Sequence, residues 1–334
     1  MSEGEFDIID RYFKRLNGLE SGVVIGIGDD CAILDIPAGH QLAVTTDTLV
    51  SGVHFFEDVD PYRLGYKALA VNLSDLAAMG ATAKWASLAI TLPDVNEPWL
   101  AEFCRGFFEL ADKYQVQLVG GDTTKGPLSI TVSAKGIVPT GQALTRSHAQ
   151  VDDVICVSGY LGDGALGLAA KLSDTKIVAD QQPFIDALEL TEPRLTLGQQ
   201  LIDHASSCID LSDGLSQDLM HILKKSDRHA QLHLEHLPLS EAILTEIDSG
   251  HLSLSEAWQY AVTGGDDYEL LFTISKHKLA SLRMRLSEQG LSLNCFEIGV
   301  ILDPNNSPLT GERLGFTHLQ QPVTLKKTGW DHFK

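Results

Sequence analysis

Aspartates stand beside glycine, serine or threonine in five separate stretches of this 334-residue sequence. These stretches are GIGDDCA (26–32), TTDTLVSGVHF (45–55), GGDTT (120–124), CIDLSDGLSQDL (208–219) and TGGDDYEL (263–270). Glycine lets the backbone turn sharply and approach a ligand, while the carboxylate supplies the hard oxygen that Mg²⁺ prefers. One such stretch would indicate only a turn or a helix cap. Five of them together predict a polyvalent-cation site of the kind that combines carboxylates with substrate phosphates.

A sixth carboxylate, Asp75, lies in GYKALAVNLSDLAAMG (65–80), whose apolar spacing is that of a helix. Asn72 precedes it by three residues and Lys67 by eight, so all three side chains share roughly one helix face. Thr45 and Thr46 add hydroxyl oxygens beside the second acidic stretch. A zinc site is not indicated, because the 12 His and 5 Cys show no ligand spacing.

Three other side chains could contact a phosphorylated or aromatic ligand. His54 is the second-last residue of the second acidic stretch, although a lone His is more often a packed or surface residue. Arg146, in ALTRS, could grip phosphate oxygens with two hydrogen bonds or could be a surface arginine. Trp330, in the closing GWDHF, could be an aromatic wall for a ligand or a packing anchor. Asp213, before the stretch GLSQDL, could likewise be only a helix N-cap.

Several familiar catalytic patterns do not occur in the sequence. It contains no Walker A motif, no set of protein-kinase motifs and no G-x-S-x-G elbow. GDGALG (162–167) matches G-x-G-x-x-G, but the following segment looks helical and no regular βαβ continuation follows. We expect a tight turn with close helix packing there, with Asp163 facing solvent. Phosphoryl transfer needs none of these motifs, since positioning and metal charge can carry it.

The charge balance excludes several classes of partner. Lys plus Arg total 25 and Asp plus Glu total 45, which gives a net charge of −20 at pH 7. Nucleic acids and anionic membranes require clustered cations, so neither is expected as a partner. No apolar run approaches the roughly 18 residues of a membrane span, and the acidic N-terminus is unlike a signal peptide. With five scattered cysteines and no C-x-x-C pair, these features predict a soluble cytoplasmic protein.

Strands and helices must position these side chains. Apolar runs predict strands at 42–47, 87–92, 116–120 and 128–138, with helices from Asp60 to residue 80 and from Pro98 to Tyr114. The pattern restarts near residue 150, with strands at 154–159, 230–236, 268–274 and 295–302 and helices at 164–172, 184–205, 214–225 and 276–289. At roughly 100 to 200 residues per domain, we expect two α/β (α+β) domains of mixed sheets packed with helices, at 1–145 and 146–334.

Eight motifs follow one another over essentially the whole chain: GIGDDCA, TTDTLVSGVHF, KALAVNLSDLAAMGA, GGDTTKGPLSITV, ALTRS, IDLSDGLSQDL, GGDDYELLFT and GWDHF. In this order they resemble the bacterial thiamine-monophosphate kinases. That family belongs to the fold superfamily of aminoimidazole ribonucleotide synthetase, selenophosphate synthetase and a hydrogenase maturation factor. The resemblance implies a two-domain aminoimidazole ribonucleotide synthetase-like architecture and a homodimer formed through the N-terminal domain.

The activity that the resemblance implies is phosphorylation of thiamine monophosphate to thiamine diphosphate, the final step of thiamine diphosphate biosynthesis. ATP would be the co-substrate and several Mg²⁺ ions would assist direct in-line transfer. The implied metal ligands are Asp30, Thr45, Thr46, Asp47, Asp75, Asp122, Asp210 and Asp213, with Asp47, Asp75, Asp122 and Asp210 the catalytic set. The implied nucleotide contacts are Gly121, Asp122, Arg146 and Ser212, and the implied contacts to thiamine monophosphate are His54, Asp266 and Trp330. The family often has Glu at the position of Asp266, which keeps the chemical type.

Two alternatives stay open at this point. The chain could be another ATP-dependent synthetase of the same superfamily, although the catalytic cysteine that selenophosphate chemistry needs near the N-terminus is missing. The acidic stretches could instead form a divalent-cation-binding module without catalytic activity.

Overall fold

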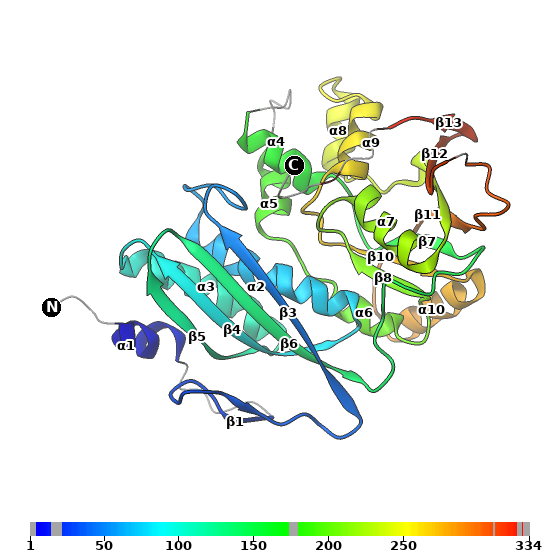
Figure 1. Cartoon of the computed structure of the whole chain (residues 1–334). Coiled ribbons are helices and arrows are strands. Elements are labelled where there is room, and N and C mark those ends of the chain that lie inside the picture. The colour runs from blue at the N-terminus through cyan, green and yellow to red at the C-terminus, as the bar shows by residue number, and fades with distance from the viewer. Residues whose placement is uncertain (1–4, 15–21, 174–179, 310, 326–328, 330–334) are drawn as a thin grey trace. The chain divides into compact units, whose positions relative to one another are not determined.

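The computed structural model describes residues 5–14, 22–173, 180–309, 311–325 and 329 (Figure 1). Helices and strands are mixed throughout, which confirms the predicted α/β class. The chain forms two compact units. The first consists of Met1–Leu76 and Ala81–Gly141, and the second of Ala77–Gly80 and Gln142–Lys334.

The first unit is built on a four-stranded sheet of order β3-β6-β4-β5. The β3–β6 and β6–β4 pairs are antiparallel, whereas β4 and β5 are parallel. Two short strands, β1 and β2, form a separate antiparallel pair. The elements are α1 (Glu5–Ile8), η1 (Ile9–Phe13), β1 (Val23–Ile25), β2 (Ile33–Leu34), β3 (His40–Val50), α2 (Pro61–Ala78), β4 (Thr82–Leu92), α3 (Glu97–Lys113), β5 (Gln117–Lys125) and β6 (Ser129–Pro139).

Helices α2 and α3 lie against one face of this sheet (Figure 1). Burial alternates strictly along β6, with every second residue from Ile130 to Val138 buried, as expected when one face is covered. The two helices approach each other closely: a Cβ at Gly65 would lie 2.0 Å from the Phe103 carbonyl oxygen, and one at Gly106 would lie 1.9 Å from that of Tyr62. The two glycines therefore permit contact between the helix backbones.

The second unit contains a seven-stranded sheet of order β13-β12-β9-β11-β7-β10-β8, in which only the β12–β9 pair is parallel. Every residue of β7, β8 and β10 is buried, so these strands are covered on both faces. The elements are β7 (Val154–Val157), α4 (Asp163–Lys171), α5 (Gln182–Glu189), α6 (Leu195–Leu201), β8 (Ser207–Asp210), α7 (Leu215–Ser226), β9 (His229–His233), η2 (Leu234–His236), α8 (Glu241–Asp248), α9 (Leu254–Thr263), β10 (Leu270–Ile274), α10 (Lys276–Glu288), β11 (Phe296–Leu302), β12 (Leu314–His318) and β13 (Gln321–Val323).

The GDGALG segment forms a tight turn into α4, as expected. Gly162 has a φ of 91° at the start of the helix, and a Cβ at Gly167 would lie 2.2 Å from the Phe184 carbonyl oxygen. Strand β7 has antiparallel neighbours on both sides, so a dinucleotide-binding βαβ unit is absent at this position. The expectation that Asp163 faces solvent was wrong: it is half-buried and accepts a 2.6 Å hydrogen bond from Ser240 Oγ.

The helical region predicted at 184–205 is confirmed. The structure has α5 and α6 there, separated by the segment that contains Pro193, which lacks a backbone N–H and disfavours a helical conformation of its predecessor. Among the described residues, no helix is long and apolar enough to cross a membrane.

Candidate functional site

Strand β3 and helix α2 bring together three of the acidic and hydroxyl residues of the first unit. Thr45 and Asp47 are two positions apart on β3, so they share the face turned toward α2. Thr45 Oγ1 donates a hydrogen bond to Asp75 Oδ2 on α2. The backbone N–H of Asp47 donates to Asn72 Oδ1 at 3.2 Å. Asn72 is fully buried, and its Nδ2 donates to the Ala68 carbonyl oxygen at 3.2 Å, which fixes the orientation of its carboxamide.

Asp47 has a perturbed carboxyl group. Burial, with a further contribution from the charge of Asp75, raises the pKa of Asp47 to about 6. Two carboxylates near each other in a partly desolvated place are costly to ionise together. A divalent cation between such groups would favour their ionised forms.

The other expected ligands of the first unit are spread more widely. Strand alternation turns Thr46 away from Asp47, and its Oγ1 donates to the carbonyl oxygen of Thr45. The register pairs Asp47 with Val132 and Asp122 with Ala89, and Asp122 is exposed. Asp30 is exposed in the loop after β1, where its N–H donates to Asp29 Oδ1 at 3.0 Å.

Gly121 has a structural reason to be glycine. Its φ is 154°, and a Cβ there would lie 1.7 Å from the carbonyl oxygen of Leu88 on the paired strand β4. Any side chain at this position would separate the two strands beside Asp122.

His54 follows the end of β3 and bonds back to it. The N–H of Val50 donates to His54 Nδ1 at 3.0 Å, so this nitrogen acts as the acceptor. In the neutral imidazole the proton is therefore on Nε2.

In the second unit, the segment between β8 and α7 carries the acidic residues. Asp210 ends β8 and is buried, whereas Ser212 and Asp213 are half-buried. Asp213 does not cap α7, so the N-cap alternative was wrong. The backbone N–H groups of Asp213 and Gly214 both donate to Asp218 Oδ2 at 3.1 Å, and Asp218 lies in the first turn of the helix.

Asp218 is almost fully buried beside two other carboxylates. Burial first, and then the charges of Asp210 and Asp213, raise the pKa of Asp218 to about 8, against the two backbone hydrogen bonds. Burial and the positive charges of Arg146 and Lys224 lower the pKa of His221 on the same helix, against the negative charge of Asp213. Arg146 itself is exposed and close enough to affect His221.

The loop 264–269 is tied to this same segment. The N–H of Asp266 donates to the Ser212 carbonyl oxygen at 3.0 Å, and the N–H of Tyr268 donates to that of Leu211 at 2.8 Å. Ser212 and Asp266 thus lie side by side within the second unit.

Comparison with known proteins gives the family. The family model described as "AIR synthase related protein, N-terminal domain" matches residues 28–138. Thiamine-monophosphate kinase of Escherichia coli (strain K12) is 47% identical over 336 residues, which cover 100% of this chain and 99% of that protein. This chain belongs to the thiamine-monophosphate kinase family.

Solved structures of the thiamine-monophosphate kinase family have the same fold. The crystal structure of thiamine-monophosphate kinase from Stenotrophomonas maltophilia K279a matches with a TM-score of 0.79 at 40% identity, covering 91% of this chain and 93% of that one. AaThiL complexed with AMPPCP and TMP matches with a TM-score of 0.75 at 28% identity, covering 90% and 89% of the two chains. The aminoimidazole ribonucleotide synthetase-like fold expected from the sequence is therefore confirmed.

The described residues of the thiamine-monophosphate kinase motifs do not form a complete set of metal ligands by themselves. Among the described residues, no three His, Cys, Asp or Glu side chains are grouped closely enough to hold a metal ion by themselves. The donors that the structure does bring together are Thr45, Asp47 and Asp75. Trp330 lies outside the described residues, and its neighbour Gly329 lies against Asp213, whose carbonyl oxygen would be 2.5 Å from a Cβ at Gly329.

Sequence reasoning gave no role to two residues that organise these groups. Asn72 was placed on the face of Asp75, but its bond to the Asp47 backbone depends on how β3 lies over α2. Asp218 lies in one of the acidic stretches. Its position in the first turn of a helix that begins after Asp-Gly was the sequence feature that could have indicated its role.

Proposed function

We propose that this protein transfers the γ-phosphoryl group of ATP to thiamine monophosphate, yielding thiamine diphosphate and ADP. The observation that carries the proposal is the half-buried pair Asp47 and Asp75 in a chain 47% identical over its full length to a thiamine-monophosphate kinase. Asn72 accepts the backbone N–H of Asp47, and Thr45 donates to the carboxylate of Asp75. The solved structure of AaThiL is a complex with AMPPCP and TMP, and these two ligands correspond to the two proposed substrates.

The donor set fits Mg²⁺. All of its members offer oxygen, and the raised pKa of Asp47 is the cost that a bound divalent cation would offset. Bound Mg²⁺ would neutralise the polyphosphate charge and align the β- and γ-oxygens. The proposed ligands of the several Mg²⁺ ions are Asp30, Thr45, Thr46, Asp47, Asp75 and Asp122 in the first unit, and Asp210 and Asp213 in the second.

The remaining residues bind and orient the two substrates. Gly121, Asp122, Arg146 and Ser212 would contact the nucleotide, with the Arg146 guanidinium suited to phosphate oxygens. His54, Asp266 and Trp330 would contact thiamine monophosphate. Its positively charged ring suits a carboxylate, and the Nε2–H of His54 suits its phosphate. A strong general base is unnecessary, because a phosphate monoester with a second pKa near ~6 is already largely ionised at pH 7.

The direct test incubates purified protein with ATP, MgCl₂ and thiamine monophosphate and measures thiamine diphosphate by chromatography. Product that depends on all three components is expected. Absence of product, with both substrates shown to bind, would overturn the proposal. A thermal-shift panel of other phosphorylated acceptors would then separate another ATP-dependent synthetase from a cation-binding module.

Asp47→Asn separates catalysis from structure. We expect at least a 100-fold fall in kcat with an unchanged or higher Tm, because the amide keeps the shape and removes a half-buried charge. Asp94→Asn, at an exposed residue paired with Lys125, is the matched control and should keep full activity. A purely structural metal site would instead lose stability and activity together.

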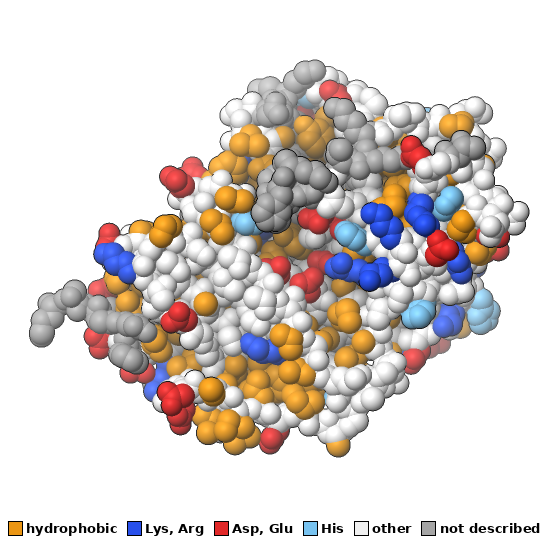
Figure 2. Space-filling view, viewed as in Figure 1, with side chains coloured by type: hydrophobic (Ala, Val, Ile, Leu, Met, Phe, Trp, Pro, Cys, Tyr) orange, Lys and Arg blue, Asp and Glu red, His pale blue; other side chains and the backbone are white. Residues whose placement is uncertain are grey.

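We further propose that the first unit forms a homodimer. Leu42 and Val44 on β3 are 45% and 58% exposed, and hydrophobic side chains gather over β3 and β6 on the sheet face without helices (Figure 2). A second copy covering this face would remove that apolar surface from water. Light scattering should show a dimer for the wild type and a monomer for Val44→Asp.

The use of ATP and five free cysteines supports a reducing compartment such as the cytoplasm.

A further inference from the structure

The loop 264–269, between α9 and β10, has an unusual backbone. Asp266 and Tyr268 have φ values of 65° and 49°, a left-handed conformation that is uncommon for residues with side chains and rare for bulky ones. Such conformations persist only where surrounding contacts determine them. The loop therefore needs external restraints to present Asp266 in a fixed place.

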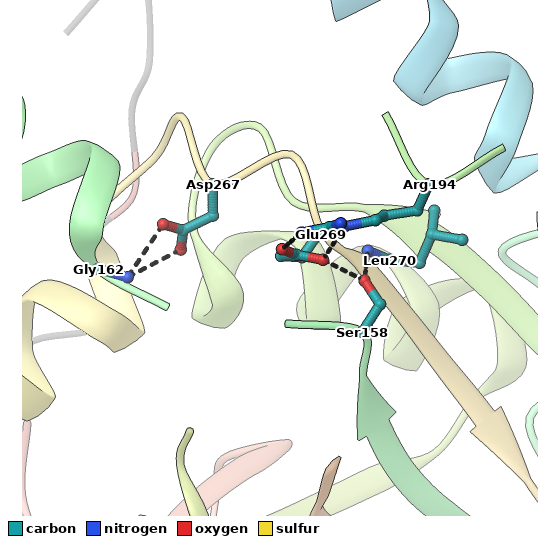
Figure 3. Close-up of polar contacts among 6 residues, drawn as sticks. All are labelled: Ser158, Gly162, Arg194, Asp267, Glu269 and Leu270. Atoms are coloured by element: carbon teal, nitrogen blue, oxygen red, sulfur yellow. Dashed lines mark hydrogen bonds and ion pairs between the residues drawn. The ribbon is translucent and has the colours of Figure 1, made fainter. Parts of the chain in front are cut away.

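One restraint is the carboxylate of Asp267. Both of its oxygens accept the backbone N–H of Gly162, at 2.9 and 3.2 Å (Figure 3). Gly162 lies at the start of α4, so this bond connects the loop to the turn of the GDGALG segment.

The second restraint is the carboxylate of Glu269, whose side chain is only 6% exposed. Arg194 grips it with two parallel bonds, from Nε to Oε2 at 2.7 Å and from Nη2 to Oε1. Ser158 Oγ donates to the same carboxylate and accepts the N–H of Leu270 at 2.7 Å (Figure 3). The grip of Arg194 therefore fixes the orientation of the residue at which the loop enters β10.

Space for this carboxylate comes from Gly159. A Cβ at Gly159 would lie 2.0 Å from Glu269 Oε1, so the carboxylate rests directly on the backbone of the segment after β7. Arg194 also balances negative charge. Burial, and after it the charges of Asp163 and Glu269, raise the pKa of Asp267. The guanidinium of Arg194 supplies the compensating positive charge within this acidic group.

We propose that Arg194 is a positioning residue for the thiamine monophosphate subsite, acting through Glu269 to hold Asp266. This inference rests on the proposed function, since it takes Asp266 as a contact of that substrate. ATP binding should be affected less. Although Ser212 also bonds the loop through its carbonyl oxygen, Asp218 holds the adjoining residues Asp213 and Gly214 through their N–H groups.

The test compares Arg194→Gln and Arg194→Lys with Arg285→Gln. Arg285 is the matched control, because it is another half-buried arginine that reaches α6, where it bonds Gln200 Oε1 and the Gln200 carbonyl oxygen at 2.9 Å. Equilibrium binding of thiamine monophosphate and the KM of each substrate are measured. Arg194→Gln should weaken thiamine monophosphate at least 10-fold in both Kd and KM, with the KM of ATP changed less than 3-fold. Arg194→Lys should restore the binding only partly, because lysine cannot form both bonds.

A double variant covers the case in which Arg194→Gln does not fold. Arg194→Met with Glu269→Gln removes the charge pair without leaving a buried unpaired charge, so its Tm should recover while its KM for thiamine monophosphate stays at least 10-fold raised. Recovery of both, or equal effects from Arg285→Gln, would overturn the positioning role. Wild-type protein that neither binds nor phosphorylates thiamine monophosphate would overturn the proposed function, whereas an active wild type with an unaltered, folded Arg194→Gln would overturn this inference alone.

Discussion

Replacing Asn72 by alanine separates the position of Asp47 from the stability of the first unit. Asn72 is fully buried and connects α2 to β3 through the 3.2 Å bond from the Asp47 N–H. Alanine would leave that N–H unsatisfied, at a cost of about 1 to 3 kcal/mol, and would also remove the bond to the Ala68 carbonyl oxygen, worth about 1 kcal/mol. We expect a loss of about 2 to 4 kcal/mol in the free energy of unfolding.

The effect on catalysis should exceed what this destabilisation explains. Freed from Asn72, the Asp47 backbone can shift, and small displacements of a catalytic group can lower the rate by up to about 100-fold. We expect kcat to fall about 10- to 100-fold at saturating ATP, Mg²⁺ and thiamine monophosphate. Urea unfolding measures the stability, and thiamine diphosphate formation measures kcat under conditions where the variant is fully folded.

Leu73→Ala is the matched control. Leu73 is fully buried beside Asn72 on α2, and its truncation should cost a comparable 2 to 5 kcal/mol by leaving a cavity. Its side chain offers no hydrogen bond to Asp47, so kcat should stay within about 2-fold of the wild type. Equal kcat values for the two variants would refute the positioning role of Asn72.

Two further predictions concern packing and pH. Gly121→Ala should lower the free energy of unfolding by at least about 2 kcal/mol, because its Cβ would lie 1.7 Å from the Leu88 carbonyl oxygen. Gly120→Ala is the control and should cause no such loss, because the space around its Cβ is open. Chemical denaturation of both variants measures the difference. Burial raises the pKa of Asp163 to about 6, partly opposed by its bond from Ser240, so the folded state holds a proton that the unfolded state releases. Stability from this group is present below about pH 4 and is lost as the pH rises through about 6, so between pH 4 and 7 the wild type should lose about 2 to 3 kcal/mol relative to Asp163→Asn. Urea titrations across this pH range that run parallel for the two proteins would contradict that assignment.

Elements with strong local signals could be predicted from the sequence. Asp60 caps α2 as expected, accepting the N–H groups of Tyr62 and Arg63, and Pro61 occupies the first turn. Helices α8 and α9 were missed although both begin with a serine cap, and Ser253 with Glu256 forms a complete capping box. Strand β12 carried no comparable signal, because its parallel pairing with β9 joins segments more than 80 residues apart.

The candidate site also has a part that the sequence predicts and a part that it does not. The spacing of glycine, aspartate and threonine was sufficient to point to Asp47 and Asp75, because a carboxylate is itself a metal ligand. The roles of Asn72 and Arg194 were not visible, because each depends on a partner brought close only by the fold. Arg194 lies 75 residues from Glu269 in sequence, so no local pattern connects the two side chains.

The contact between Gly159 and Glu269 restricts the order in which the sequence can change. With a glutamate at 269, even a methyl group at 159 would collide with the carboxylate, so a larger residue at 159 becomes acceptable only after residue 269 has been shortened. A shorter residue at 269 would in turn leave Arg194 without its partner. Substitutions at these three positions are therefore coupled, and neutral drift at any one of them must wait for a compatible change at another.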